Sequence, residues 1–423
     1  MDEESKTPAE IPLLQSSSRG SASAIQTLGN IIVSIVGTGI LGLPFAFRVA
    51  GWGAGSLGVM IAGLCTYYCM RALVQCKDKL ATEELVEEHK TYGDLGYKCL
   101  GTPGRCLTEF LIFISQCGGA VAYLVFIGQN LESIFNGHGL TCAEYIFLLV
   151  PIEIALSWIG SLSALAPSSI FADICNVLAM AIVLKEDVQK VMGGGFSFKD
   201  RKAFTDKIGG LPFAGGMAVF CFEGFGMTLA LERSMKKKGA FSTLLAKVFT
   251  GITLVYVLFG FCGYMAYGDE TKDIITLNLP RSWSAIAVQI GLCLGLVFTF
   301  PIMVHPVNEI VEDKLKKVHW FQKLHYNDNI ALTRLAKVGI YLSRAILVVL
   351  LATLASCVPG FGIFASLVGS TVCALLSFVL PSAFHLKLLG PSLHPLQKTL
   401  DFCILFGGLL FAVYGTYSTV IGV

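Results

Sequence analysis

The stretch VGTGILGLP, which runs from Val36 to Pro44, decides how this chain folds. Its glycines, Gly37, Gly39 and Gly42, have the G-x-G-x-x-G spacing that cradles dinucleotide phosphates in soluble enzymes. That fingerprint requires a strand before the glycines, a helix after them and an acidic residue about 20 positions further on. Here the flanks read LGNIIVSI and FAFRVAGW, and the later residues read VMIA. The flanks therefore exclude a nucleotide-binding interpretation.

The composition indicates a membrane protein. The chain has 423 residues, 14% of them charged, and a mean hydropathy of +0.69, whereas soluble domains carry about 25% charged residues. Apolar runs of about 20 residues, each long enough to cross a hydrocarbon core of roughly 30 Å, recur along the whole length. A net charge of +2 gives no reason to expect a nucleic-acid partner. The 14 cysteines show no metal-ligand spacing, so neither a metal nor a cofactor is expected.

The apolar windows predict an all-α integral membrane fold with about eleven transmembrane helices. The expected spans are 25–50, 54–76, 105–136, 142–160, 165–185, 210–231, 242–268, 284–311, 336–358, 360–385 and 398–420. The longest polar connections, 77–104, 186–209 and 312–335, are too short for a folded soluble domain. We therefore expect a disordered tail at 1–24 and a single transmembrane domain over 25–423.

Lysine and arginine favour a cytoplasmic N-terminus, because most of them then fall in cytoplasmic loops, as in Lys236-Lys237-Lys238. The loop at 186–209 opposes this bias. With an odd number of spans, the C-terminus would lie on the lumenal side.

The glycines and proline of residues 36–44 predict that the first span is broken. Glycine loses the most backbone entropy on ordering, and proline lacks an N–H. Unpaired backbone at bilayer depth survives only where it is buried in protein or lines a cavity. A second such stretch, GGLPFAGGMAVFCFEGFG at 209–226, falls in the sixth span. Spans one and six are equivalent in a chain of two five-span inverted repeats, here 25–185 and 210–385, with an extra helix at 398–420.

The two breaks are suited to a zwitterion. Half-helix N-termini favour anions, so the first break would hold a carboxylate. The amides expected to face it belong to Gly37, Thr38, Gly39 and Ile40. Carbonyl groups near Phe222 and Glu223 in the sixth span would accept hydrogen bonds from an ammonium. We expect the backbone of an amino acid between them, with Phe220, Phe222 and Phe225 either walling the side-chain pocket or packing the core.

Glu223 is the first candidate for proton coupling, because an ionised carboxylate inside a span costs roughly 2.5–3.5 kcal/mol. A hydrogen-bonded brace that holds the broken helix open is the alternative. His305 in the eighth span is the second candidate, because histidine titrates near neutrality. Tyr123 in the third span could reach a substrate carboxylate, or pack between helices. Four further intramembrane polar groups compete with weaker claims, namely Glu132, Glu153, Asp173 and Asn176.

Four segments resemble the amino acid/auxin permease family of the APC superfamily. They are GTGILGLPFAFRVAGW at 37–52, TYGDLGYKCLG at 91–101, SLSALAPSSIFAD at 161–173 and CFEGFGMTLALERSM at 221–235. The similarity covers nearly the whole chain after the tail. Within the family, the chain looks closest to plant vacuolar neutral amino acid transporters and animal lysosomal proton-coupled amino acid transporters.

The resemblance implies the leucine-transporter fold with five-plus-five inverted repeats, helices 1 and 6 broken, and symport of a neutral amino acid with protons out of an acidic lumen. Carried over by position, the substrate contacts would be Gly37, Thr38, Gly39 and Gly42 of span 1 and Phe222, Glu223 and Gly224 of span 6. The proton-coupled animal relatives carry a histidine seven residues before the first motif glycine, where this chain has Asn30. The proton role then either shifts to Glu223, or the coupling is left open. A sodium-coupled amino acid transporter is a separate alternative.

The resemblance implies a location in the vacuolar or lysosomal membrane. The segment from Glu10 to Leu14 is close to an acidic dileucine sorting signal and mildly favours the same location. An amino acid sensor that signals to a cytoplasmic partner is the alternative of a different class. The sequence predicts no obligate protein partner. An enzyme is not expected, because no nucleophile with an adjacent base stands out.

Overall fold

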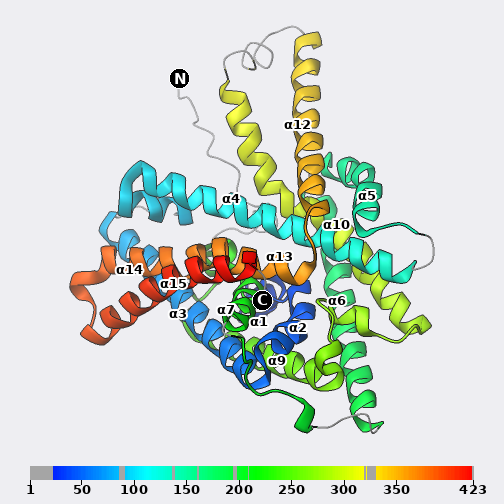
Figure 1. Cartoon of the computed structure of the whole chain (residues 1–423). Helices are drawn as coiled ribbons and strands as arrows, with labels where there is room; N and C mark the ends of the chain where they lie inside the picture. Colours follow the sequence, from blue (N-terminus) through cyan, green and yellow to red (C-terminus); the bar gives the residue numbers. More distant parts are fainter. Residues whose placement is uncertain are drawn as a thin grey trace.

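The computed structural model is almost wholly helical (Figure 1). It describes residues 22–84, 91–135, 139–159, 162–193, 198–207, 209–318, 321 and 330–421. The expected tail therefore falls almost entirely outside the described residues. The helices are α1 (Ala24–Ile35), α2 (Leu43–Ala50), α3 (Trp52–Glu84), α4 (Tyr92–Ile134), α5 (Cys142–Ser157), α6 (Leu162–Met192), α7 (Gly210–Cys221), α8 (Phe225–Ser234), α9 (Phe241–Tyr267), α10 (Trp283–Lys317), α12 (Ile330–Ser356), α13 (Phe361–Val368), α14 (Leu380–Leu389) and α15 (Pro395–Ile421). In these ranges the only β pairing is an isolated bridge between Ala22 and Met235.

The apolar segments found in the sequence coincide with these helices. Eight described helical segments are long and apolar enough to cross a membrane, and the bent pair Ala24–Ile35 and Thr38–Ala50 makes a ninth if it counts as one span. The eight do not include α5, which has only 16 residues, or α6. The all-α membrane fold is thus confirmed, whereas the count of eleven spans and the repeat boundaries stay predictions.

Several helices are longer than their apolar windows. The polar connection expected at 77–104 is largely helical, since α3 continues to Glu84 and α4 begins at Tyr92. A capping box between Thr91 and Asp94 starts α4, and Gly101, with φ of +69°, bends it. The difference has a simple cause: hydropathy reports the thickness of the bilayer, whereas a helix can extend into water wherever its residues favour helix formation.

The two broken spans lie at the centre of the molecule. Figure 1 shows α1, α2 and α7 in the middle, and α7 packs against α2, α3 and α13. The approach of α7 to the tenth span is very close, because a Cβ atom added to Gly369 would lie 1.8 Å from the carbonyl oxygen of Gly216. Only glycine fits such a contact, so small residues also set the helix packing here, as they commonly do in membranes.

The tenth span, where α13 leads into α14, contains an irregularity that the sequence did not predict. Two π-helical segments, Gly369–Cys373 and Leu375–Val379, separate the α-helical parts. π-Bulges widen a helix by one residue and are frequent at functional sites. The first π-helical segment, η7 (Gly369–Cys373), packs against α7. The wide part of the tenth span therefore lies next to the broken sixth span.

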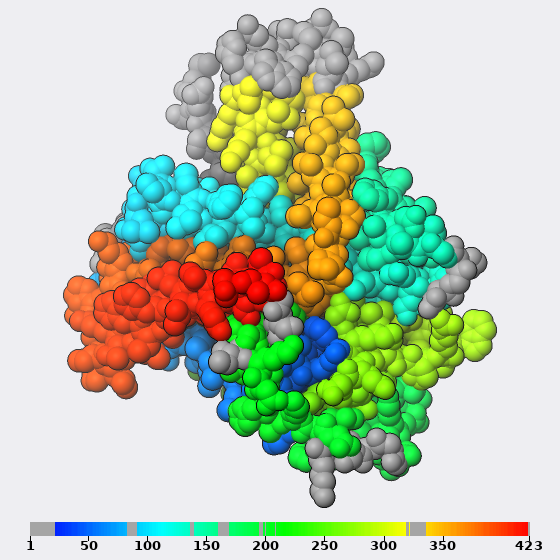
Figure 2. Space-filling view, in the orientation of Figure 1, coloured from blue at the N-terminus to red at the C-terminus, as the bar shows by residue number. Residues whose placement is uncertain are grey.

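The outer surface is apolar. Large exposed side chains follow the outward faces of α12 and α15, which cover much of the face seen in Figure 2. Those on α15 include Leu396, Phe406, Leu410, Val413 and Val420, each more than 60% exposed. Exposing so large an apolar patch to water would be unfavourable, whereas lipid tails can solvate it. The exposed faces therefore support a bilayer as the surroundings of the chain.

Candidate functional site

The first break lies where the glycine cluster predicted it. Helix α1 ends at Ile35, and a 3₁₀ segment, η2 (Thr38–Gly42), leads into α2 with a bend of 45° between the two halves. The amide of Gly37 donates to the carbonyl oxygen of Ile35 at 3.0 Å, and the amide of Ile40 to that of Gly37 at 3.5 Å. Of the four predicted amide donors, these two are therefore already occupied.

The second break lies at Phe222–Gly224, between α7 and α8. The amide of Phe222 is shared between the carbonyl oxygens of Ala218 and Val219, both at 3.2 Å, and the amide of Glu223 donates to Phe220 at 3.3 Å. These bonds tighten the last turn of α7, as at many helix C-termini.

The two breaks face one another. A Cβ atom added to Gly39 would lie 3.2 Å from Cys221 Sγ, and one added to Gly224 would lie 3.2 Å from Ile35 Cγ1. Each break therefore touches the end of the opposite half-helix. A Cβ atom on Gly42 would come within 3.1 Å of Met217 Sδ on α7. The glycines of the motif thus allow the two spans to approach closely, and they also allow the backbone to leave the helical conformation.

Hydrogen-bonding groups remain at this junction. Within the described residues, the amides of Thr38 and Gly39 make no backbone hydrogen bond, and no backbone amide donates to the carbonyl oxygens of Phe222 and Glu223. Donors thus lie at the start of η2 and acceptors at the end of α7. This arrangement has the polarity that a carboxylate and an ammonium on one small molecule require.

The Glu223 side chain is half-buried and points toward two other spans. Its carboxylate lies beside the hydroxyl of Ser115 on α4, and Cys373 of the π-helical segment is a further neighbour. Nearby, the hydroxyl of Tyr92 donates to the carbonyl oxygen of Leu376 at 2.6 Å. The carboxylate therefore lies between the third, sixth and tenth spans, and no sequence pattern distinguishes Ser115 or Cys373 as its neighbours.

The phenylalanines divide between core and junction. The Phe222 ring is 1% exposed and packs on Phe249, with ring centroids 6.0 Å apart, and on Tyr256 at 5.0 Å. Phe225 is fully buried. Phe220 is partly exposed and lies near Gly39. The Phe222 side chain therefore belongs to the core, so that its carbonyl group is the part left for a substrate. Of these three phenylalanines, Phe220 is the one whose ring lies against Gly39.

The other candidates lie apart from the breaks in every described contact. Tyr123 on α4 faces Asp173 of α6. His305 on α10 has Nδ1 3.7 Å from Glu309 Oε1. Glu153 is fully buried with both carboxylate oxygens unpartnered. No described contact places Glu132 or Asn176 at the junction. Within the described residues, no three His, Cys, Asp or Glu side chains are grouped to hold a metal ion.

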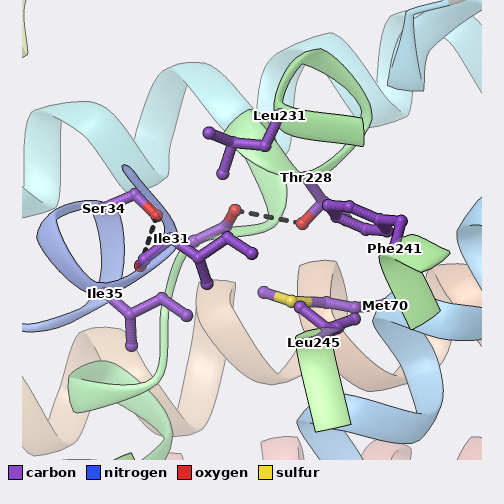
Figure 3. Close-up of a pocket in the computed structure, with 9 residues that line it drawn as sticks. Ile31, Ser34, Ile35, Met70, Thr228, Leu231, Phe241 and Leu245 are labelled. Atoms are coloured by element: carbon purple, nitrogen blue, oxygen red, sulfur yellow. Dashed lines mark hydrogen bonds between the residues drawn. The ribbon is translucent and has the colours of Figure 1, made fainter. Parts of the chain in front are cut away.

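A small hollow of about 190 Å³, counting its open mouth, lies beside the second break (Figure 3). Apolar side chains form most of its wall: Ile31, Ile35, Met70, Leu231, Phe241 and Leu245. The hydroxyls of Ser34 and Thr228 donate to carbonyl oxygens of their own helices, those of Ile31 and Gly224. Neither Thr38 nor Gly39 lines the hollow, so it lies next to the junction of the breaks and does not coincide with it.

One contact at the breaks was not expected from the sequence. The hydroxyl of Tyr256, on α9, lies 3.1 Å from the carbonyl oxygen of Ile35 and 3.2 Å from that of Cys221. These are the last residues of α1 and α7. A tyrosine inside an apolar span carries no distinguishing pattern, so only the folded arrangement reveals this link.

Two broken spans that meet at the centre of a helical membrane bundle define the class of secondary transporters. The solved structure of Mhp1 in its inward-facing conformation shares the fold, with a TM-score of 0.57 and 12% identity over 99% of this chain and 93% of that one. Over residues 20–421 the sequence matches the family described as transmembrane amino acid transporter protein. The chain belongs to this family of amino acid transporters, which are not enzymes.

Two relatives show how far the similarity extends. Amino acid transporter ANT1 of Arabidopsis thaliana is 68% identical over 95% of this chain and 93% of its own length. Vacuolar amino acid transporter 3 of Saccharomyces cerevisiae is 27% identical over 94% of this chain and 56% of its own length. The family resemblance drawn from the four sequence segments is thereby confirmed.

Proposed function

We propose that the chain carries neutral amino acids together with protons from the vacuolar lumen to the cytosol by alternating access. The observation that carries this proposal is the junction of the two breaks. In the described part of the chain, the amides of Thr38 and Gly39 at one break make no backbone hydrogen bond, and the carbonyl groups of Phe222 and Glu223 at the other accept none. An amino acid backbone presents a carboxylate and an ammonium with the matching polarity.

The surroundings of the junction favour a neutral side chain. Cys221 and Phe220 lie against Gly39, and Ile35 and Met70 against Gly224. Among the described residues that reach the breaks, only Glu223 carries a charge. If Glu223 accepts the proton or faces the ammonium, no group is left to balance a charged substrate side chain, whose desolvation would then cost several kcal/mol.

Glu223 is our candidate for the proton carrier, because its carboxylate borders the breaks, hydrogen-bonds with Ser115 of the third span and lies near Cys373 of the tenth. A group that touches both a mobile half-helix and its neighbours can couple protonation to helix movement. His305 is the second candidate, since its ion pair with Glu309 would change with protonation.

The vacuolar address rests on the yeast relative, whose name places it at the vacuole, and on the sorting-like segment from Glu10 to Leu14. The positive-inside bias and an odd number of spans support an N-terminus in the cytoplasm and a C-terminus in the lumen. An acidic lumen then drives protons and substrate in the same direction, toward the cytosol.

Uptake into proteoliposomes tests the proposal. The purified chain should accumulate labelled alanine or proline when the pH gradient points inward, and a protonophore should abolish the accumulation. Replacing the pH gradient by a sodium gradient should give exchange without accumulation. Accumulation driven by sodium alone would show that sodium, and not the proton, is the coupling ion. Absence of both uptake and counterflow with every neutral amino acid would reject the proposed function.

A further inference from the structure

The C-terminal ends of the two half-helices α1 and α7 converge on one side chain of α9. The last carbonyl groups of an α-helix have no partner within the helix and carry its negative partial charge. Here the carbonyl oxygens of Ile35 and Cys221, the last residues of α1 and α7, both lie within 3.2 Å of the Tyr256 hydroxyl. One phenol therefore donates to two helix ends that belong to different broken spans.

Two negative helix ends brought together in a dry interior need a positive partner. In broken-helix transporters, unwound carbonyl groups and half-helix C-termini can bind a cation for this reason. A hydroxyl donor meets part of the same need without a net charge, because its proton is shared between the two carbonyl oxygens. Within the described residues, Ile35 also accepts from the amide of Gly37 at 3.0 Å, whereas no backbone amide donates to Cys221. Without the hydroxyl, the buried carbonyl group of Cys221 would lack a partner, which would destabilise the junction.

The position of the Tyr256 hydroxyl is fixed by packing. The residue is fully buried, and its ring lies 5.0 Å from that of Phe222, which itself stacks on Phe249. Phe222 directly follows Cys221 in the chain. The ring and the hydroxyl of Tyr256 thus hold the same end of α7, the ring by tilted packing on Phe222 and the hydroxyl by hydrogen bonding.

We propose that Tyr256 is a positioning residue that clamps the two breaks together and so sets the distance between the groups that bind the amino acid backbone. The amides of Thr38 and Gly39 begin three residues after Ile35, and the carbonyl groups of Phe222 and Glu223 directly follow Cys221. A shift of either half-helix would move donors and acceptors apart. The role in substrate binding rests on the proposed function, whereas the clamp itself does not.

Replacement of Tyr256 by phenylalanine removes the hydroxyl and keeps the ring. Substrate counterflow without a pH gradient should show KM for a neutral amino acid raised about tenfold, the scale expected when buried carbonyl groups lose a shared donor. The maximal rate should change less than KM. Tyr264→Phe is the matched control on the same helix, because its hydroxyl instead accepts from the amide of Lys202 at 3.2 Å. An unchanged KM in Tyr256→Phe, with or without a lower maximal rate, would overturn the proposal.

A cross-link tests the clamp without reference to transport. In a Gly39→Cys variant, the new side chain should reach Cys221, because a Cβ atom at position 39 lies 3.2 Å from Cys221 Sγ. Mild oxidation should join the two positions, and mass spectrometry of the linked peptides measures the yield. Adding Tyr256→Phe should lower this yield severalfold, and adding Tyr264→Phe should not. Equal yields in both backgrounds would overturn the clamp. A reduced yield, together with absence of transport by the chain with Gly39 and Tyr256 unchanged, would support the clamp and reject only the proposed function.

Discussion

Gly39 lies directly against Cys221, so that the first turn beyond one break touches the last turn before the other. These two residues are 182 positions apart in the sequence, which follows from their numbers. Their contact shows that the two breaks form one junction.

Gly39→Val should strongly reduce transport. Its branched side chain would enter the 3.2 Å space before Cys221 Sγ and cover the amide donors of η2. Overpacking of this kind costs about 1–3 kcal/mol, so we expect counterflow to fall at least roughly tenfold while the protein still folds. Gly58→Ala on α3 is the control, because nothing lies within 4 Å of a Cβ atom there. Normal counterflow in Gly39→Val would show that Gly39 is not part of the binding site.

Glu223→Gln should uncouple transport from the proton. The amide keeps the size and the hydrogen bonding of the side chain near Ser115 but cannot exchange a proton. Counterflow of labelled substrate should therefore persist, whereas accumulation driven by a pH gradient should disappear. Glu109→Gln on the exposed face of α4, which loses only a surface pair with Arg105, is the control. If Glu223→Gln still concentrates substrate, then the same measurement on His305→Gln decides whether the second candidate carries the proton.

The buried ion pair between Lys77 and Glu232 should stabilise the ends of α3 and α8. Glu232 is 1% exposed, and Lys77 also lies 3.3 Å from the exposed Asp78. Lys77→Leu leaves the Glu232 carboxylate buried without its partner, which typically costs about 3–5 kcal/mol. Thermal unfolding in detergent should show a clear fall in Tm for this variant and a smaller fall for Glu232→Leu, since Lys77 retains Asp78. The double Leu variant should recover most of the loss, and additive losses would contradict the assignment.

Gly369→Ala should prevent the tenth span from docking on α7. The added Cβ atom would lie 1.8 Å from the carbonyl oxygen of Gly216 and 3.0 Å from the amide nitrogen of Phe220, and backbone atoms cannot give way as flexible side chains do. We expect a strong loss of folded protein, seen as a drop in the monodisperse fraction on gel filtration. Gly407→Ala on α15 meets nothing within 4 Å and should behave as the unmodified chain. Equal yields of the two variants would show that the contact can relax.

The sequence predicted the parts of the site that depend on local backbone preference. Three glycines and a proline between residues 36 and 44 are unfavourable in a helix wherever they occur, and the break at Gly37 follows. The same reasoning located the second break at Gly224. Of the four amide donors expected, Gly37 and Ile40 are bonded within the chain, because the first turn after the break is a 3₁₀ turn.

The remaining features depend on tertiary contacts that leave no local pattern. Tyr256 is one tyrosine in an apolar span, and its role exists only because two helix ends meet beside it. Ser115 and Cys373 border Glu223 through the packing of the third and tenth spans. The extension of α3 to Glu84 was missed for another reason, since hydropathy marks where a helix leaves the membrane and not where it ends.

A structure with a bound neutral amino acid, chosen by competition in proteoliposomes, tests the central claim most directly. The account predicts density for the ligand between the two breaks, with its carboxylate on the amides of Thr38 and Gly39 and its ammonium on the carbonyl groups of Phe222 and Glu223. Ligand density only in the hollow formed by Ile31, Met70 and Leu245, or anywhere else away from both breaks, would contradict it.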